Sequence, residues 1–175
     1  METLLLVVDM QNDFIDGALG TPEAQAVLPA VEARIRAHRG PVIFTRDTHD
    51  AGYLNTQEGK RLPVPHCVAG TPGWELAPAL EALRQARQAP CVDKPTFGSI
   101  ELAHRLRRAA DAGEFGAVEL VGVCTDICVL SNALLLKAAL PEIPISVNAA
   151  CCAGVTPESH ATALRAMAAC QIDIL

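Results

Sequence analysis

Short runs of apolar residues alternate along the chain with longer stretches in which apolar residues recur every three or four positions. The short runs have the length of buried strands, and the longer stretches have the period of helices with one apolar face. The pattern therefore predicts two sets of elements. The predicted strands are residues 4–8, 42–45, 91–92, 118–121, 145–147 and 172–175, and the predicted helices are residues 23–38, 76–88, 99–112, 127–140 and 157–169.

The alternation of strand and helix is typical of parallel sheets, because consecutive parallel strands need a crossover connection. Hydrophobic residues make up 50% of the chain but aromatic residues only 3%, which favours the aliphatic core of a buried parallel sheet. A length of 175 residues fits one domain. We expect a doubly wound three-layer α/β/α sandwich with a mainly parallel six-stranded sheet, formed as a single domain by residues 1–175.

Helix boundaries carry their own signals. The sequence Thr-Pro-Glu begins at Thr21 and again at Thr156, and in each case places a capping residue before a proline at the first helical position. Pro29 predicts an interruption of the helix at 23–38, because proline lacks the backbone N–H that a helix interior uses. The stretch 48–72 shows no regular period, and so long an irregular segment inside a compact domain is typically functional.

Composition and charge exclude several classes of partner. The chain has 14 basic and 20 acidic residues and a net charge of -6, with one small basic group at Arg105, Arg107 and Arg108, which argues against nucleic acid as a partner. No apolar run approaches the ~20 residues of a membrane span, and the opening METLLLVVDMQ lacks the features of a signal peptide. We expect a cytoplasmic protein with no membrane partner and with mostly reduced cysteines.

Residues with reactive or metal-binding side chains follow the predicted strands. Asp9 follows the first strand, Asp47 and His49 follow the second, Lys94 follows the third, and the sequence GVCTDICV, residues 122–129, follows the fourth. The carboxyl ends of the strands in such sheets surround the ligand site. These residues are therefore expected to converge on one crevice, although they are far apart in the sequence.

The sequence GVCTDICV contains two cysteines four residues apart. Cys124 is expected in the turn and Cys128 in the first turn of the next helix, which Thr125 or Asp126 can cap. Because the N-terminus of a helix lowers the pKa of a thiol, this position favours Cys128 as a nucleophile.

A nucleophilic thiol needs a base that accepts its proton and a cation that stabilises the anion. Asp9 and Lys94 are residues of these types at neighbouring strand ends. The residues alone also allow a structural interpretation, in which Asp9 caps a helix or pairs with a lysine and Cys128 is a buried apolar side chain.

The irregular stretch contains a second group of candidate residues: Asp47, His49, Glu58 and His66. Carboxylate and neutral imidazole are suitable ligands for zinc, manganese or iron. The Asp-x-His spacing is weak evidence, because a long surface loop contains polar residues for other reasons. His104 and His160 lie on predicted helices, where a surface or capping position is expected.

Four motifs together resemble the isochorismatase-like cysteine hydrolases, the superfamily that contains nicotinamidases and N-carbamoylsarcosine amidases. They are VVDMQNDF, DKPTFGS, GVCTDICV and AGVTPESHATALRAM, and they occur in the same order over nearly the whole chain. The resemblance implies a catalytic triad of Asp9, Lys94 and Cys128. It also implies an oxyanion hole formed by the backbone N–H groups of Cys124 and Cys128, with a cis peptide between Val123 and Cys124.

The resemblance to the nicotinamidase-like branch also implies a divalent metal ion, zinc first and manganese or iron as alternatives. Asp47, His49 and His66 match the family's metal ligands. Many relatives have a third histidine in this loop; Asn55 stands near that position here, and Glu58 is the substitute that some relatives use.

The resemblance implies aromatic walls of a substrate pocket at Phe14 and Phe97, for which core packing is the alternative interpretation. Pro63 stands near the place where many nicotinamidases have an aromatic residue that stacks on the pyridine ring, and this difference weakens the nicotinamide assignment.

The expected function is hydrolysis of a small amide, with nicotinamide to nicotinate and ammonia as the first choice, through a thioester. The alternatives are isochorismatase-like vinyl-ether hydrolysis, hydrolysis of an N-carbamoyl amide, a non-catalytic metabolite-binding or partner-binding protein, and a redox sensor that uses Cys124 and Cys128. Isochorismatases commonly lack the nucleophilic cysteine and the metal set. Family resemblance also implies a homo-oligomer.

Overall fold

The computed structural model describes residues 1–175 and contains one six-stranded sheet in the order β3-β2-β1-β4-β5-β6. All neighbouring strands are parallel, as predicted. The strands are β1 (Thr3–Val8), β2 (Val42–Asp47), β3 (Cys91–Lys94), β4 (Ala117–Val123), β5 (Ile145–Ala153) and β6 (Asp173–Ile174). The predicted strand at 145–147 is therefore only the first part of a longer strand that includes Cys151 and Cys152.

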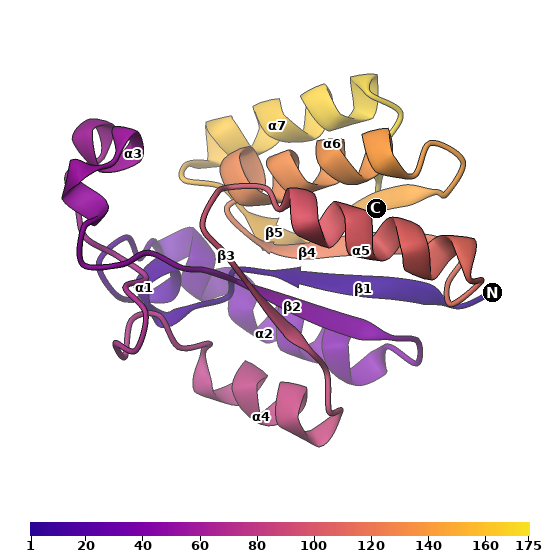
Figure 1. Ribbon diagram of the computed structural model, residues 1–175, viewed down its shortest axis with the longest axis horizontal. Helices are drawn as coiled ribbons and strands as arrows, with labels where there is room; N and C mark the ends of the chain where they lie inside the picture. Colours follow the sequence, from indigo (N-terminus) through magenta and orange to yellow (C-terminus); the bar gives the residue numbers. More distant parts are fainter.

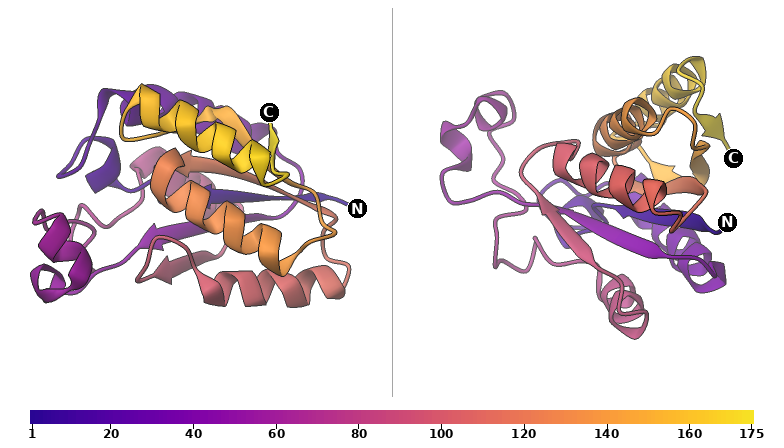
Figure 2. Two further views of the ribbon diagram at one scale, coloured as in Figure 1. Left: turned by 90° about the horizontal axis from the view of Figure 1, so that it is seen from above. Right: turned by 45° about the vertical axis from the view of Figure 1, so that its right-hand side comes forward.

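Helices cover both faces of the sheet, which confirms the three-layer α/β/α prediction (Figures 1 and 2). On one face lie α2 (Pro22–Ala37) and α4 (Pro78–Ala86), and on the other lie α5 (Ile100–Asp111), α6 (Leu130–Ala139) and α7 (Pro157–Ala169). Two short helices, α1 (Asn12–Ile15) and α3 (Gln57–Arg61), lie outside these layers. No helix is both long and apolar enough to cross a membrane.

The core has two parts, one on each face of the sheet. Successive side chains of a strand point to opposite faces, so Leu4 and Leu6 pack with α5, α6 and α7, whereas Leu5 and Val7 pack with α2 and α4. All four side chains are buried. This burial on both faces explains why β1 is a continuous apolar run and not an alternating one.

The helix boundaries follow the predicted signals at Thr21 and Thr156, whose side chains accept hydrogen bonds from Ala24 and Ser159. The predicted interruption at Pro29 was wrong, because α2 continues through this proline from residue 22 to residue 37. Val27 and Val31, on either side of Pro29, are buried against the sheet. A proline in a helix interior costs about 3 kcal/mol. The packing of the residues on both sides of Pro29 offsets this cost.

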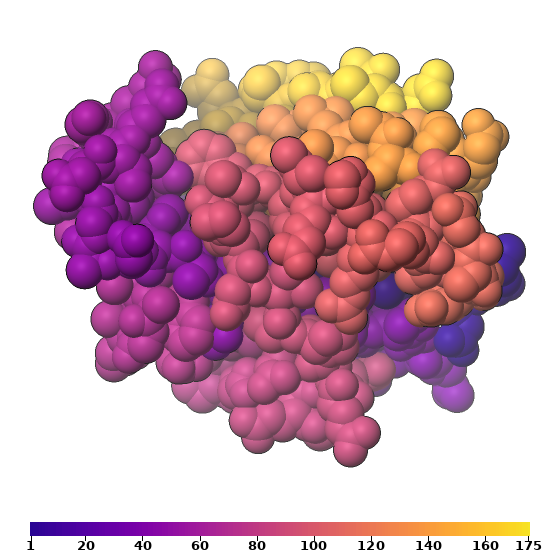
Figure 3. All heavy atoms as spheres, in the orientation of Figure 1, coloured from indigo at the N-terminus to yellow at the C-terminus, as the bar shows by residue number.

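The stretch 48–72 is less irregular than predicted. It contains a 3-10 helix, η1 (Tyr53–Asn55), and α3, which Thr56 caps through its side chain. In Figure 1 this segment projects beyond the carboxyl ends of β1 and β2, and in the space-filling view of Figure 3 it forms one end of the molecule. The segment thus lies at the edge where the predicted site residues end their strands.

Candidate active site

The three predicted triad residues meet at the carboxyl end of the sheet. Asp9 directly follows β1, Lys94 ends β3, and Cys128 lies in a π-helical turn, η2 (Thr125–Val129), between β4 and α6. Asp9 and Lys94 are 0% exposed and Cys128 is 4% exposed. Parallel strands bring their carboxyl ends to one edge, which is why residues so far apart in the sequence become neighbours.

Lys94 contacts both other members of the triad. Its Nζ lies 2.6 Å from Oδ2 of Asp9 and 3.6 Å from Sγ of Cys128. Nζ also donates a hydrogen bond to the carbonyl of Thr96. The second carboxylate oxygen of Asp9 accepts a hydrogen bond of 2.6 Å from the Thr45 hydroxyl. A buried cation, a carboxylate and a thiol therefore form one connected cluster.

Burial dominates the electrostatics of this cluster. It raises the pKa of Asp9 above the ordinary value, and the Lys94 ammonium offsets only part of that effect. Burial alone would lower the pKa of Lys94, but the charges of Asp9 and its neighbours raise it above the usual range. The ion pair holds Lys94 in its charged form, and a carboxylate with a raised pKa is a stronger base.

The sequence predicted a lowered thiol pKa at Cys128, and this was wrong. Burial first, and then the charge of Asp9, raise the pKa of Cys128 well above the ordinary value, although Lys94 opposes both. Cys124 also has a raised pKa, about 12, with burial as the main cause. The thiol of Cys128 is therefore protonated at rest and needs a neighbouring base for activation.

The turn that carries the cysteines differs from an ordinary helix start. Neither Thr125 nor Asp126 caps α6: the Thr125 hydroxyl is 2.8 Å from Nδ1 of His160, and the Asp126 carboxylate accepts the N–H of Val155. His160 lies on a helix, as predicted, and through this contact it reaches from α7 to the turn that contains Cys128. Gly122 approaches β1 so closely that a Cβ would lie 2.1 Å from the carbonyl oxygen of Val8.

Backbone groups of this turn are available to a ligand. The peptide between Val123 and Cys124 is cis, as the family resemblance implied. The carbonyl of Cys124 accepts the N–H groups of Ile127 and Val129, whereas the N–H of Cys124 donates to no backbone carbonyl. An unpaired N–H beside the Cys128 thiol is the kind of donor that an oxyanion hole requires.

The four predicted metal ligands form a second cluster. Asp47, His49, Glu58 and His66 each offer one ligand atom, and these atoms lie within 4.8 Å of one another. Nε2 of His49 is 3.0 Å from Oδ2 of Asp47 and 3.5 Å from Oε1 of Glu58. Nε2 of His66 is 3.6 Å from Oδ2 of Asp47. Glu58 approaches from α3, and the other three residues lie on or beside the sheet edge and the following loop.

The donor set fits a divalent cation. Two carboxylates and the Nε2 atoms of two imidazoles face one another in a largely buried position, and this is a donor set that a divalent cation prefers. Nδ1 of His66 lies 2.8 Å from the carbonyl of Val64, which fixes the ring so that Nε2 faces the cluster. Burial raises the pKa of Asp47, but the two imidazoles and Lys94 outweigh this, and the pKa lies below the ordinary range.

Three residues that support the metal cluster were not singled out from the sequence. The buried Gln11 donates to the carbonyl of Asp47 and accepts its N–H. Asp13 accepts the N–H of Cys67, next to His66. The ring of Tyr53 contacts both imidazoles, at centroid distances of 4.6 Å and 5.0 Å. Gln11 and Asp13 lie within the motif VVDMQNDF, which was the available signal, whereas Tyr53 had none.

Asn132 on α6 contacts the turn that contains Cys128 and was also not singled out from the sequence. Its amide nitrogen donates to the carbonyls of Cys128 and Phe97, and its amide oxygen accepts the N–H of Ser99. Asn132 is buried. The Asn132 side chain thus connects the turn that contains Cys128 to the loop between β3 and α5.

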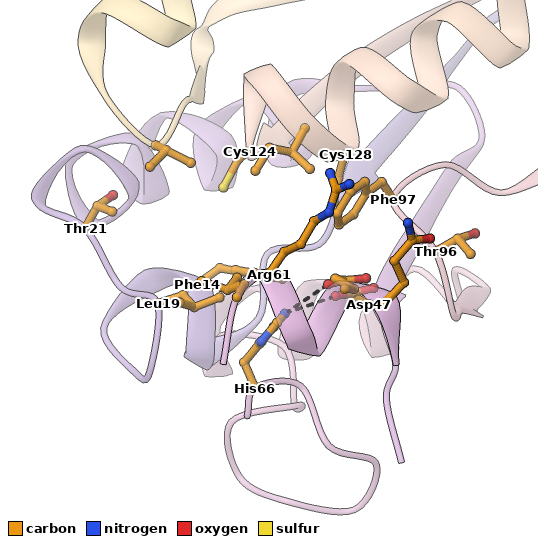
Figure 4. A pocket seen from close by; sticks show the side chains of 15 residues that line it. Phe14, Leu19, Thr21, Asp47, Arg61, His66, Thr96, Phe97, Cys124 and Cys128 are labelled. Atoms are coloured by element: carbon orange, nitrogen blue, oxygen red, sulfur yellow. Dashed lines mark ion pairs between the residues drawn. The ribbon is translucent and has the colours of Figure 1, made fainter. Parts of the chain in front are cut away.

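A cavity of about 680 Å³ brings the triad and the metal cluster together. Cys128 opens into it from one side, and Asp47 and His66 from the other (Figure 4). Glu58 also lines the cavity. Phe14 and Phe97 both line it; Phe14 is buried and also packs in the core, whereas Phe97 is 43% exposed. The remaining lining residues are Leu19, Thr21, Gln57, Arg61, Leu62, Thr96, Cys124, Ile127 and Val155.

The sequence from residue 3 to residue 175 matches the model of the isochorismatase domain family. The chain belongs to this family. A relative named uncharacterized isochorismatase family protein PncA, from Bacillus subtilis strain 168, is 30% identical over 177 residues, which cover 94% of this chain and 93% of the relative.

Solved structures of similar proteins have the same fold over their full length. The pyrazinamidase/nicotinamidase of Streptococcus mutans UA159 has a TM-score of 0.83 and 29% identity, with 99% of each chain covered. The pyrazinamidase of Pyrococcus horikoshii, solved in complex with zinc, has a TM-score of 0.77 and 27% identity, covering 100% of this chain and 99% of the other.

Proposed function

We propose that this protein is a metal-containing cysteine amidohydrolase that converts a small amide, with nicotinamide as the first choice, to the carboxylic acid and ammonia. The observation that carries the proposal is the Cys128 thiol, open to the cavity and 3.6 Å from a lysine that pairs with a buried carboxylate. Relatives that are named nicotinamidase or pyrazinamidase, over their whole length, support the choice of an amide.

The first half of the reaction forms a thioester. Asp9 accepts the proton of Cys128, and the thiolate attacks the amide carbonyl carbon. The N–H groups of Cys124 and Cys128 stabilise the oxyanion. In other enzymes one such donor lowers the activation free energy by about 3–4 kcal/mol. Asp9 then returns its proton to the leaving nitrogen, the C–N bond breaks, and ammonia departs.

The second half of the reaction consumes water. Asp9 accepts a proton from a water molecule, whose oxygen attacks the thioester carbonyl in the same oxyanion hole. The C–S bond breaks, the proton returns to the Cys128 sulfur, and the carboxylic acid leaves. Lys94 stays charged throughout and stabilises first the Asp9 carboxylate and then the thiolate.

Asp47, His49, Glu58 and His66 would hold the divalent ion, zinc first and manganese or iron as alternatives. The zinc complex of the Pyrococcus horikoshii relative supports this choice. When bound, the ion would supply a Lewis acid at the cavity wall, able to bind a polar atom of the substrate or to lower the pKa of water. Asp47 reaches both clusters, since its Oδ1 lies 3.5 Å from Nζ of Lys94.

Phe14 and Phe97 provide the apolar walls that would hold the body of the substrate while its amide reaches Cys128. Pro63 does not line the cavity, so the stacking partner of a pyridine ring would have to come from these two phenylalanines.

The test is ammonia release from nicotinamide by purified, metal-analysed protein, with the variants Cys128→Ala and Cys124→Ala compared. We expect Cys128→Ala to lower kcat by at least about 10⁴-fold, as the loss of other covalent nucleophiles does. Cys124→Ala keeps the backbone N–H, so we expect it to retain turnover. Equal losses in both variants, or turnover by Cys128→Ala, would contradict the mechanism.

We further propose a single domain over residues 1–175, a cytoplasmic location and a homo-oligomer. These proposals rest on chain length, composition and family resemblance. Light scattering that gives a monomer would remove the last of them.

A further inference from the structure

The start of α7 contacts the turn that contains Cys128 through side chains that the proposed mechanism does not use. The Thr125 hydroxyl lies 2.8 Å from Nδ1 of His160, the fourth residue of α7. The Asp126 carboxylate accepts the N–H of Val155, just before that helix. Figures 1 and 2 show α7 beside α6, the helix that follows η2. Two consecutive residues of η2 are thus connected to a segment far along the chain.

The Thr125 hydroxyl depends on His160. Thr125 is 0% exposed, and its hydroxyl makes no other hydrogen bond. A buried hydroxyl that loses its partner costs free energy, because water cannot replace the lost bond. The contact therefore favours one orientation of the Thr125 side chain, and it holds the backbone of this residue in place relative to α7.

The packing around His160 does not offer a substitute for this contact. The half-buried His160 side chain lines a second cavity of about 330 Å³. Gly154 packs against it, since a Cβ at this position would lie 2.9 Å from the Cβ of His160. Ala163 and Met167 bury α7 in the core independently of His160. Removal of the imidazole should therefore leave α7 in place and free the Thr125 hydroxyl.

The position of Thr125 matters for the proposed oxyanion hole. Thr125 directly follows Cys124 and lies three residues before Cys128, so its backbone connects the two proposed N–H donors. Such donors are effective only when both are directed at the place where the oxyanion forms. A displacement of about 1 Å at a site of this kind can cost about 10²-fold in rate.

We propose that His160 is a positioning residue, which acts through the Thr125 hydroxyl to keep the N–H groups of Cys124 and Cys128 directed at one oxygen atom. The inference rests on the proposed amidohydrolase activity and adds a residue that does not line the substrate cavity. Because the oxyanion forms only after attack, a loss of alignment should slow the reaction more than it weakens substrate binding.

The first experiment measures kcat and KM for ammonia release from nicotinamide. His160→Ala should lower kcat at least about tenfold with little change in KM. His160→Asn should keep part of the rate, because its amide can still bond with the Thr125 hydroxyl. Thr125→Val keeps the shape of the side chain and should lose as much as His160→Ala. The double variant should lose little more, since both changes remove the same contact.

His104→Ala is the matched control. His104 is exposed on α5, on the same face of the sheet as α7, and does not line the cavity. Its replacement should leave kcat and KM unchanged. Losses in the His160 and Thr125 variants that add together in the double variant, or a His160→Ala loss that appears in KM alone, would overturn the proposal.

Titration with pyridine-3-carbaldehyde separates alignment from a loss of folded protein. On addition, Sγ of Cys128 bonds to the carbonyl carbon, the carbonyl π electrons move to the oxygen, and the thiol proton follows them. The adduct thus places an oxygen where the oxyanion forms. His160→Ala should raise the dissociation constant of the aldehyde at least about tenfold, and in the Cys128→Ala background it should leave that of nicotinate unchanged. A smaller folded fraction would lower the stoichiometry at an unchanged dissociation constant, and this result would overturn the proposal.

The same titration distinguishes failure of this inference from failure of the proposed function. A wild-type protein that forms no adduct at Cys128 and releases no ammonia would remove the proposed function and this inference together. A wild-type protein that does both, with His160→Ala equal to it in kcat and in aldehyde affinity, would remove the inference alone.

Discussion

The triad and the metal cluster lie in the same crevice but are built by different parts of the chain. Asp9, Lys94 and Cys128 are attached to β1, β3 and the turn after β4, in the buried centre of the sheet. Glu58 and His66 lie in the stretch 48–72, which projects from the sheet edge. The residues that we propose for proton transfer are thus on the sheet scaffold, whereas two of the four proposed metal ligands are on a loop.

The contacts that hold the triad in place differ from those that hold the loop. The triad is held by the strand ladder and by the core on both faces of the sheet. The loop is held by contacts within itself and by side chains of α1: the hydroxyl of Tyr53 donates to the carbonyl of Leu62, and Asp13 accepts the N–H of Cys67. A change in the triad should therefore disturb the whole fold, whereas a change in the loop should disturb mainly the ligands that it holds.

The largest effect should come from breaking the buried ion pair of the triad. Lys94→Met leaves the Asp9 carboxylate buried without a cation, which typically costs about 3–5 kcal/mol of unfolding free energy. Urea unfolding measures the loss, and ammonia release should disappear as well. Adding Asp9→Asn to Lys94→Met should recover part of the stability, because the uncompensated charge is gone, but none of the activity.

Arg36→Met is the control for that experiment. Its ion pair with Glu32 is exposed, with 60% and 30% of the two side chains accessible, and pairs of this kind are worth less than about 1 kcal/mol. If Lys94→Met and Arg36→Met lowered the free energy of unfolding by the same small amount, the triad region would not be the rigid part of the molecule.

The next effect should appear in the loop as a loss of metal without a loss of fold. His66→Ala should lower the metal content of the purified protein more than Glu58→Gln, because the His66 side chain is 2% exposed and the Glu58 side chain 22% exposed. Both variants should unfold at nearly the wild-type urea concentration. Elemental analysis gives the metal content, and chelation of the wild-type protein should reproduce the His66→Ala result. A His66→Ala variant that unfolds like Lys94→Met would contradict the distinction between the regions.

The smallest effect concerns a buried charge that belongs to neither region. Glu119 on β4 accepts hydrogen bonds from Arg34 and Asn148. Burial raises the pKa of Glu119, but these contacts outweigh it and lower the pKa below the ordinary value. A lowered folded-state pKa contributes stability above the unfolded value, about 4.3, that is lost as the pH falls through the folded value.

We therefore expect the wild-type protein to exceed Glu119→Gln in unfolding free energy near neutral pH, and the difference to shrink as the pH falls below about 4.3. Urea unfolding at a series of pH values measures it. Turnover at neutral pH should persist in the variant, since Glu119 does not line the cavity. A difference that grows on acidification would mean that the contacts with Arg34 and Asn148 do not lower the pKa.

The sequence by itself determined the layers of the fold and the edge at which the chemistry lies. Continuous apolar runs and helical periods predict a parallel sheet between helices, and parallel strands must present their carboxyl ends at one edge. Asp9, Lys94 and the cysteine turn could thus be expected to meet before any contact was known. Which cysteine lies beside Lys94 followed from family resemblance, and the distance of 3.6 Å agrees with it.

Only the tertiary structure decided properties that depend on what surrounds a residue. Burial raised the pKa of Cys128, where the local sequence suggested that a helix N-terminus would lower it. Packing kept α2 continuous through Pro29. The local sequence pattern determines which helices and strands form. The burial of a side chain, the charges around it and the residues it contacts depend on distant segments that fold against one another.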